Sequence, residues 1–187
     1  LGQRVGAELG IPVYLYEEAA LSEARRNLAD VRRGEYEAIR DEIATLESRK
    51  PDFGPRQMGP AGAVAIGARA PLIAFNVYLN TGSIEVAKAV ARAIRHSSGG
   101  LRYCKALGLL VEGRAQISMN LTNFRQTPML RVLELIRSEA AKWGCSVVQC
   151  EVVGLIPQEA LLDAATAALQ LHSFKAGQVL ENRIAGL

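Results

Sequence analysis

The side chains best suited to chemistry gather first in residues 116 to 123, QISMNLTN. Gln116, Ser118, Asn120 and Thr122 alternate with apolar residues, a period of two that predicts a β-strand with one face against a core. The other face carries only amides and hydroxyls, which donate and accept hydrogen bonds without bearing charge. Such residues suit the wall of a binding cleft or a domain interface.

A second candidate is the glycine-rich run GPAGAVAIGAR, residues 59–69. Gly62 and Gly67 have the spacing of a phosphate-binding loop, but Ala68 and Arg69 follow where that loop requires Lys and Ser or Thr. We therefore reject a phosphate loop and expect these glycines to let the backbone approach a ligand or a neighbouring strand closely. Arg69 could pair with a carboxylate, or it could be an ordinary surface arginine.

Histidine and cysteine give no metal or disulfide pattern. His96 and His172 have no partner at ligand spacing, so we expect no metal site. Cys104, Cys145 and Cys150 form no C-x-x-C pair, and their odd number argues against a full disulfide framework. A reduced, cytoplasmic setting fits best.

Composition excludes several classes of protein. Hydrophobic residues make up 49% of the 187, enough for a core, but no run approaches the roughly 18 apolar residues of a membrane span. The net charge is +3, and the pairs Arg25-Arg26 and Arg32-Arg33 are interleaved with acidic residues. This pattern indicates a solvated helical face, and we expect no nucleic-acid binding.

The first part of the chain predicts a helix, a strand and two further helices. Leu1, Val5 and Leu9 are spaced along one side of a helix, and no methionine precedes them. We therefore expect the sequence to be a fragment, with a trimmed or processed start as the alternative. Residues 12–18 predict a strand, Asn27 a helix cap, and the stripe from residue 36 to 46 a second helix. Residues 51–62 hold three prolines and three glycines and predict an irregular loop.

From residue 71 the elements follow the order β-α-β-β-α-β. We expect strands at residues 71–80, 101–109, 114–122 and 146–155, with helices at 83–97 and 127–143, and an extra helix at 157–170. Ser83 and Thr127 are the expected helix caps, and Trp143 is expected on the buried side of its helix. This order predicts an α+β, ferredoxin-like fold with both main helices on one face of the sheet.

That topology places the first and third strands side by side at the centre. Asn76, Tyr78, Ser118 and Asn120 would then meet on the open face, with Tyr103, Lys105, Gln149 and Glu151 beside them. The open face is either one wall of a binding cleft or a polar surface facing water.

Several longer blocks together carry a family resemblance. They are IPVYLYEEAA, RRNLADVRRGEYE, PDFGP, GARAPLIAFNVYL, SSGGLRYCKALG, QISMNLTN and EVVGLIPQEALLDAA. In this order the chain resembles the formimidoyltransferase family along nearly its whole length. The resemblance implies two ferredoxin-like subdomains with a folate cleft between them. Residues 1–70 would be the C-terminal part of the N-terminal subdomain with its connector, and residues 71–187 the C-terminal subdomain.

The resemblance also implies an activity. The family moves a formimidoyl group between 5-formimidoyltetrahydrofolate and L-glutamate in histidine breakdown, so tetrahydrofolate is the carrier and L-glutamate or N-formimidoyl-L-glutamate the other partner. The family's folate segment follows its D-F-G-P motif and maps onto Gly54, Pro55, Arg56, Gln57, Met58, Gly59, Pro60, Ala61 and Gly62, in a loop slightly shorter than usual. The cleft wall would include Arg69, Asn76, Tyr78, Ser118 and Asn120. The oligomeric state stays open, with a homo-oligomer among the alternatives.

One departure concerns the general base. The family's catalytic histidine belongs to an H-P-R motif in the first subdomain, upstream of LGQRVGAELG, and neither His96 nor His172 lies in such a motif. We therefore expect this chain to contain no catalytic residue and to be inactive alone. A non-catalytic folate-binding or interaction module on the same scaffold is the alternative.

Overall fold

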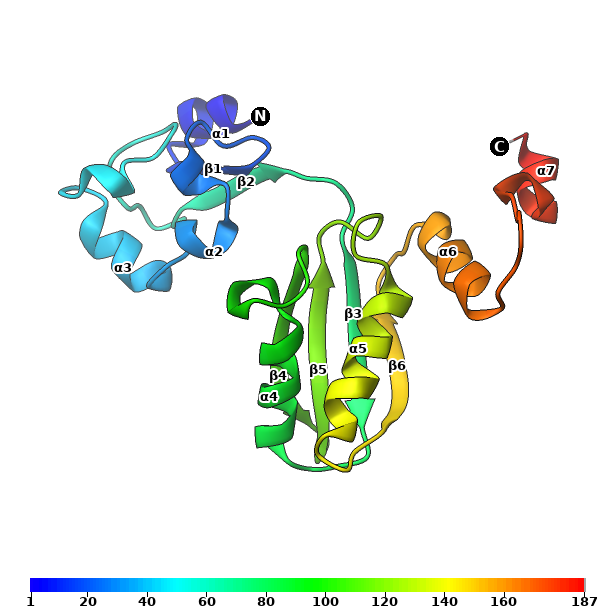
Figure 1. Ribbon diagram of the computed structural model, residues 1–187. Helices are drawn as coiled ribbons and strands as arrows, with labels where there is room; N and C mark the ends of the chain where they lie inside the picture. Colours follow the sequence, from blue (N-terminus) through cyan, green and yellow to red (C-terminus); the bar gives the residue numbers. More distant parts are fainter. Residues whose placement is uncertain (187) are drawn as a thin grey trace. The chain divides into compact units, whose positions relative to one another are not determined.

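The computed structural model describes residues 1–186 and divides the chain into two compact units (Figure 1). Unit 1 is Leu1–Arg69 and unit 2 is Ala70–Leu187. The elements of unit 1 are α1 Gly2–Leu9, β1 Val13–Glu17, η1 Glu23–Arg25, α2 Leu28–Val31, α3 Glu35–Glu42, η2 Glu47–Arg49 and β2 Val64–Ala68. The elements of unit 2 are β3 Ile73–Leu79, α4 Ile84–Ile94, η3 His96–Ser98, β4 Cys104–Val111, β5 Arg114–Leu121, α5 Met129–Ala141, β6 Val147–Val153, α6 Gln158–Ala168, η4 Ala176–Gln178 and α7 Leu180–Ala185.

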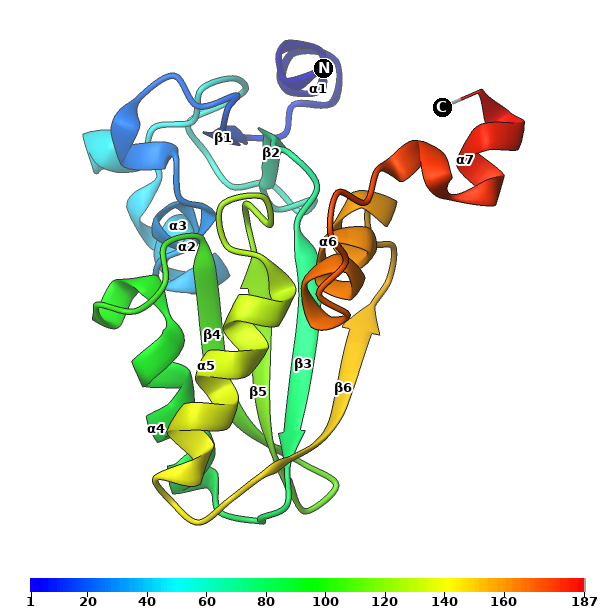
Figure 2. The ribbon, with the colours of Figure 1, turned by 45° about the vertical axis from the view of Figure 1, so that its right-hand side comes forward.

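Unit 2 is built on a four-stranded antiparallel sheet with the order β4-β5-β3-β6. The first and third strands of the unit, β3 and β5, are central neighbours, and Asn76 lies opposite Ser118. Helices α4 and α5 cover one face of this sheet (Figures 1 and 2). The ferredoxin-like prediction is confirmed, because the element order and the strand order both match it.

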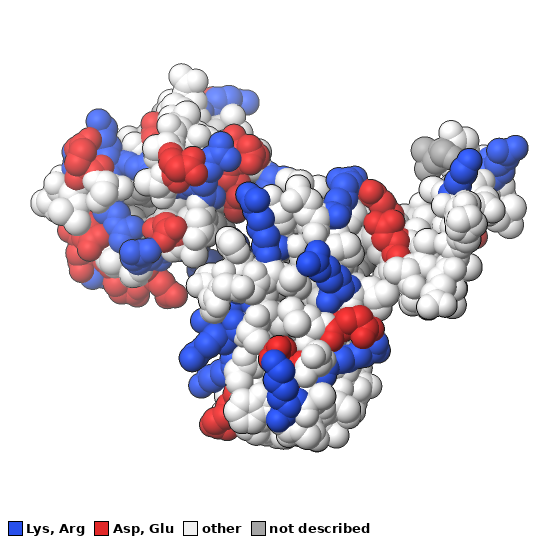
Figure 3. All heavy atoms as spheres, viewed as in Figure 1, with Lys and Arg blue, Asp and Glu red and all other residues white. Residues whose placement is uncertain are grey.

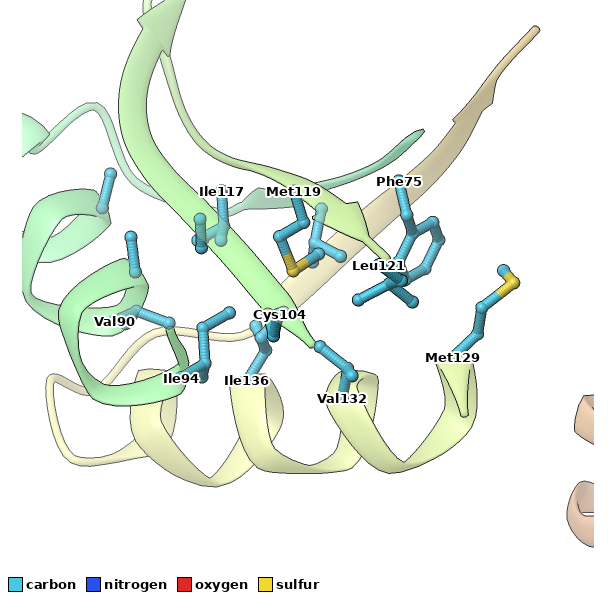
Figure 4. Packing of buried hydrophobic residues seen from close by; sticks show 14 of the residues in the cluster. Phe75, Val90, Ile94, Cys104, Ile117, Met119, Leu121, Met129, Val132 and Ile136 are labelled. Carbon is cyan, nitrogen blue, oxygen red and sulfur yellow. The ribbon is translucent and has the colours of Figure 1, made fainter. Parts of the chain in front are cut away.

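The core of unit 2 lies between the sheet and these two helices (Figure 4). Every second residue of β3, from Ile73 to Leu79, is buried, as the period of two requires. Ile117, Met119 and Leu121 of β5 point the same way and meet α5 residues such as Val132 and Ile136. The alternate residues of both strands are thereby placed on the uncovered face.

Local sequence features explain where α4 begins and how β4 turns into β5 in unit 2. The Ser83 hydroxyl accepts a hydrogen bond from the Val86 amide at 3.3 Å, so the expected cap of α4 is confirmed. That helix ends at Ile94, earlier than expected, and a short 3-10 turn follows. Glu112 and Gly113 both have positive φ, which is the two-residue hairpin turn that joins β4 to β5 with matching twist.

Two predictions for α5 are wrong. Thr127 does not cap the helix; its hydroxyl donates to the Arg102 carbonyl, and Pro128 takes the cap position. Trp143 is 54% exposed because the helix ends at Ala141, so the residue falls beyond the regular turn that would carry it to the core. Met129, Val132, Ile136 and Ala140 are buried as expected.

Unit 1 contains a two-stranded parallel sheet, β1 beside β2. Strand β2 was not expected, because its sequence, VAIGA, reads as part of a glycine-rich run. Gly67 explains its composition: a Cβ there would lie 2.4 Å from the ring of Tyr16, the residue paired with it in β1. The missing side chain at Gly67 thus leaves room for the Tyr16 ring of the neighbouring strand. Close approach of a neighbouring strand was one of the two roles expected for these glycines. The small core of this unit consists of Tyr14, Val31 and Ile43.

Helix α1 is present, but its apolar stripe does not face the core. Leu1 is 86% exposed and Leu9 66%, whereas Gly2 and Gly6 are buried. A Cβ on Gly6 would lie 2.6 Å from the amide nitrogen of Gly54. The helix therefore packs through its glycines, which allow the backbones to approach closely.

Charged side chains of both signs alternate over unit 1 (Figure 3). Arg33 pairs with Asp30 at 2.5 Å, and Arg26 with Glu23 at 3.1 Å. Arg26 and Arg33 are therefore paired locally, as expected of a solvated surface. Arg25 departs from this expectation, because it forms a mostly buried ion pair with Asp52 at 2.6 Å. Over residues 1–186 the helices are all too short or too polar to cross a bilayer.

Candidate functional site

The loop from Gly54 to Gly62 begins at a position that only glycine fits well. Gly54 has φ +84, and a Cβ there would lie 2.4 Å from the Ile11 carbonyl oxygen. The preceding residues are tied to β1, since the Val13 amide donates to the Phe53 carbonyl at 2.9 Å. The start of the loop is therefore held in register against β1.

Arg56 holds the middle of the loop to the α3–η2 connection. Its Nε donates to the Ile43 carbonyl at 3.0 Å, and its Nη1 donates to the Glu47 carboxylate at 2.8 Å. The hydrogen bond from Arg56 lowers the pKa of Glu47 below its ordinary value. The Arg56 side chain remains 34% exposed.

Met58 connects the loop to a cavity inside unit 1. It packs against the Tyr14, Val31 and Ile43 cluster and lines a cavity of about 350 Å³ with Tyr36 and other residues. Burial raises the pKa of the Tyr14 phenol, whose hydroxyl donates to the Arg49 carbonyl at 2.7 Å. The cavity walls are therefore largely apolar and aromatic, in the size range of small-molecule sites.

The end of the loop is a tight turn. The Gly62 amide donates to the Gly59 carbonyl at 3.0 Å across Pro60 and Ala61. Proline at the second position and glycine at the fourth suit such a turn. Nothing lies within 4 Å of a Cβ built on Gly59, so its neighbourhood is open to solvent or a ligand. Pro55, Gln57, Pro60 and Ala61 are exposed.

The open face of the unit 2 sheet brings together most of the polar residues predicted to share it, but Tyr103 precedes β4 with φ +64 and lies outside the paired strand. Asn76 lies opposite Ser118 on one side and Glu151 on the other. Tyr78 lies one row away, and Asn120 lies opposite Ala74 in the next row on the other side. Arg114 sits over the Tyr78 ring, 5.7 Å from its centroid.

Glu151 is the feature that sequence reasoning undervalued. Its Oε2 accepts a hydrogen bond from the Asn76 amide at 3.1 Å and another from the Tyr78 hydroxyl at 3.2 Å. Two of the groups expected on this face, the Asn76 amide and the Tyr78 hydroxyl, therefore share one carboxylate oxygen. The strand register could have indicated this contact, because it places Glu151 directly opposite Asn76.

The remaining candidates lie elsewhere. Arg69 is exposed at the end of unit 1. His96 in η3 and His172 after α6 are both exposed. Among residues 1–186, no three His, Cys, Asp or Glu side chains gather as metal ligands.

Comparison with protein families covers both units. Residues 1–69 match the family described as "Formiminotransferase domain, N-terminal subdomain", and residues 74–181 match "Formiminotransferase domain". The chain belongs to the formiminotransferase family. The resemblance identified from the sequence blocks is thereby confirmed.

Individual relatives agree with this assignment. The chain is 50% identical over 188 residues to "Glutamate formimidoyltransferase" of Thermoplasma acidophilum, covering 98% of this chain and 62% of that protein. It is 44% identical over 190 residues to the protein of the same name from Streptococcus pyogenes serotype M1, covering 100% of this chain and 63% of that protein. It is 42% identical over 173 residues to "Formimidoyltransferase-cyclodeaminase" of Gallus gallus, covering 88% of this chain and 32% of that protein. The chain thus spans less than two thirds of the length of these relatives.

Proposed function

We propose that this chain takes part in transfer of a formimidoyl group between 5-formimidoyltetrahydrofolate and L-glutamate. The observation that carries the proposal is the similarity to two proteins named glutamate formimidoyltransferase along at least 98% of this chain. Residues 1–70 belong to the N-terminal formimidoyltransferase subdomain and its connector, and residues 71–187 to the C-terminal one. Three free cysteines support a reducing compartment, the cytoplasm.

The proposed transfer reaction defines what its active site must do. A bond forms between the attacking amine nitrogen and the formimidoyl carbon, and the bond from that carbon to the donor nitrogen breaks. A base takes the proton of the attacking amine, and the leaving nitrogen takes up a proton as its bond to carbon breaks. A well-placed base contributes roughly 10²- to 10⁴-fold in rate. The two histidines, His96 and His172, are exposed and lie in no H-P-R sequence, so this chain contributes binding rather than the base.

The loop from Gly54 to Gly62 is the proposed folate contact. Its glycines leave backbone groups accessible to the donors and acceptors along a pterin edge. Met58 and the aromatic cavity beside it suit the face of a flat ring. The exposed part of Arg56 suits a carboxylate of the glutamyl tail.

A titration of the 187-residue chain with 5-formyltetrahydrofolate, a reduced folate, tests this assignment. We expect Arg56→Ala to weaken binding roughly tenfold or more, since it removes a charge-assisted contact of about 1.5–3 kcal/mol. Gly59→Val should also weaken binding while leaving the fold intact, because a Cβ at Gly59 meets nothing within 4 Å.

Glu47→Gln is the matched control for Arg56→Ala. It breaks the ion pair between Glu47 and Arg56 but keeps the guanidinium, so folate affinity should be retained. If Arg56→Ala and Gly59→Val both bind as the parent does, the loop is only a connector. If the parent itself fails to bind a reduced folate, the proposed function is wrong and the interaction-module alternative stands.

A further inference from the structure

The two edges of the unit 2 sheet differ in how they are protected against pairing with another strand. Strands β4 and β6 are the end strands of the sheet, on its opposite sides in Figures 1 and 2. The pairing of β6 with β3 shifts register between Tyr78 and Leu79, an irregularity that disrupts an edge. Eight consecutive pairs join β4 to β5 with no register shift, and Lys105 is the only charged residue of β4. Strand β4 therefore lacks the bulges, prolines and repeated charges that usually protect an edge.

The backbone groups on the outer side of β4 follow from its hairpin. The two-residue turn before β5 makes Val111 and Arg114 a hydrogen-bonded pair, and such pairs then recur at every second residue of β4. The Thr122 amide donates to the Tyr103 carbonyl at 2.9 Å, in keeping with this alternation. The residues between these pairs direct their N–H and C=O groups away from β5, where no strand of residues 1–186 pairs with them. They are Ala106, Gly108 and Leu110.

Apolar side chains flank this edge on both faces of the sheet. Leu107 is 61% exposed and Leu109 40% exposed on the open face, opposite Ser118 and Gln116 of β5. Leu110 is 50% exposed on the other face. A long, regular and apolar edge of this kind is suited to the addition of another strand.

The sequence around Gly108 indicates which strand fits. Residues 106–110 read ALGLL, which is nearly the same in both directions about the glycine. A second copy related by a two-fold axis at Gly108 would pair antiparallel, with Leu107 opposite the partner's Leu109 and Ala106 opposite the partner's Leu110. Lys105 would lie opposite the partner's Val111, far from the second lysine. The edge is thus complementary to itself in apolar contacts and in charge.

We propose that β4 is an interface at which two copies of this chain pair edge to edge, joining their four-stranded sheets into one. The outward backbone groups of residues 106, 108 and 110 bond across the axis, and Leu107 and Leu109 pack over it on the open face. This inference is independent of the proposed function, because it requires neither folate nor glutamate.

Analytical ultracentrifugation of the 187-residue chain over a concentration series tests the interface. We expect the parent to reach the mass of a dimer and Leu107→Lys to stay a monomer, because the two-fold axis brings two lysines into an apolar interface. Leu107 is largely exposed in the single chain, so the variant should fold, as checked by circular dichroism. Val153→Lys is the matched control: it places the same side chain at a residue 50% exposed on the other edge strand, β6, and should leave the dimer intact.

Amide hydrogen exchange followed by NMR tests the register. The amides of Ala106, Gly108 and Leu110 should exchange more slowly as the concentration rises, whereas those of Leu107 and Leu109 already bond to β5 and should change little. The inference is overturned if the parent stays monomeric at every concentration, if Leu107→Lys still dimerises, or if the three outward amides gain no protection. Dissociation by Val153→Lys alone would assign the interface to β6 and overturn it as well. None of these outcomes alters the folate titration that tests the proposed function.

Discussion

Cys104 on the core face of β4 has an environment that should make it inert. It is 1% exposed, and burial raises the pKa of its thiol to about 11. Cys150 on β6 is exposed, and burial raises the pKa of its thiol more modestly. Because the thiolate is the reactive form, both accessibility and ionisation protect Cys104 in the folded chain.

We therefore predict that iodoacetamide at pH 8 labels Cys150 while leaving Cys104 unmodified, as read by mass spectrometry of peptides. In denaturant all three cysteines should be labelled, which controls for intrinsic reactivity. Fast labelling of Cys104 in the native chain would contradict its place in the core. Protection should weaken as the pH rises toward 11, because the thiolate fraction then grows.

For single residues, the sequence predicted which face of the sheet a side chain occupies better than it predicted its hydrogen-bond partner. Alternation placed Asn76 and Ser118 on one face correctly. It could not show that Asn76 and Tyr78 donate to Glu151. That contact depends on the register of a strand that is distant in the sequence, since Asn76 and Glu151 are 75 residues apart. The prediction that Thr127 caps α5 was wrong for a similar reason. Its hydroxyl donates instead to the Arg102 carbonyl, which is distant in the sequence.

The packing of β4 against α4 depends on a glycine. A Cβ on Gly108 would lie 2.3 Å from the backbone carbon of Ala87 and from the Lys88 nitrogen. Backbone atoms cannot swing aside as the end of a side chain can, so the helix would have to move from the sheet. Overpacking of this kind typically costs about 1–3 kcal/mol.

We expect Gly108→Ala to lower the free energy of unfolding of unit 2 by about 1–3 kcal/mol or more, measured by urea unfolding followed by circular dichroism. Gly59→Ala is the matched control, because nothing surrounds its Cβ and its φ is not positive. It should leave stability within about 0.5 kcal/mol. Equal effects of the two substitutions would show that close contact at Gly108 is not what the helix requires.

Elements were predictable where periodicity and caps agreed. Strand β3 alternates perfectly and α4 has both an apolar stripe and Ser83, so both appeared as expected. Strand β2 and the orientation of α1 could not be predicted, because glycines carry their packing. A pattern of hydrophobic residues gives no sign that the Gly54 backbone packs against Gly6 or that the Tyr16 ring packs over Gly67.

The described residues, 1–186, form two hydrophobic cores. One lies in unit 2 between the sheet and helices α4 and α5, and the other in unit 1 around Tyr14, Val31 and Ile43. The sequence predicted the first from its element order. The second was harder to predict, because its residues come from a strand, a one-turn helix and the end of α3 rather than from one periodic segment.

Separate cores predict separate responses to core substitutions. Ile43 is 1% exposed in unit 1 and Ile136 is fully buried in unit 2. Truncating either to alanine removes buried methyl and methylene groups and leaves a cavity, at a cost of about 2–5 kcal/mol. Each substitution should therefore speed amide hydrogen exchange mainly in its own unit: Ile43→Ala in β1 and β2, and Ile136→Ala in β3 and β5. Each variant serves as the control for the other, and native-state exchange measured by peptide mass spectrometry reads both units in one sample. If Ile43→Ala accelerates exchange in β3 and β5 as strongly as in β1, the two units unfold together and their cores are one cooperative system.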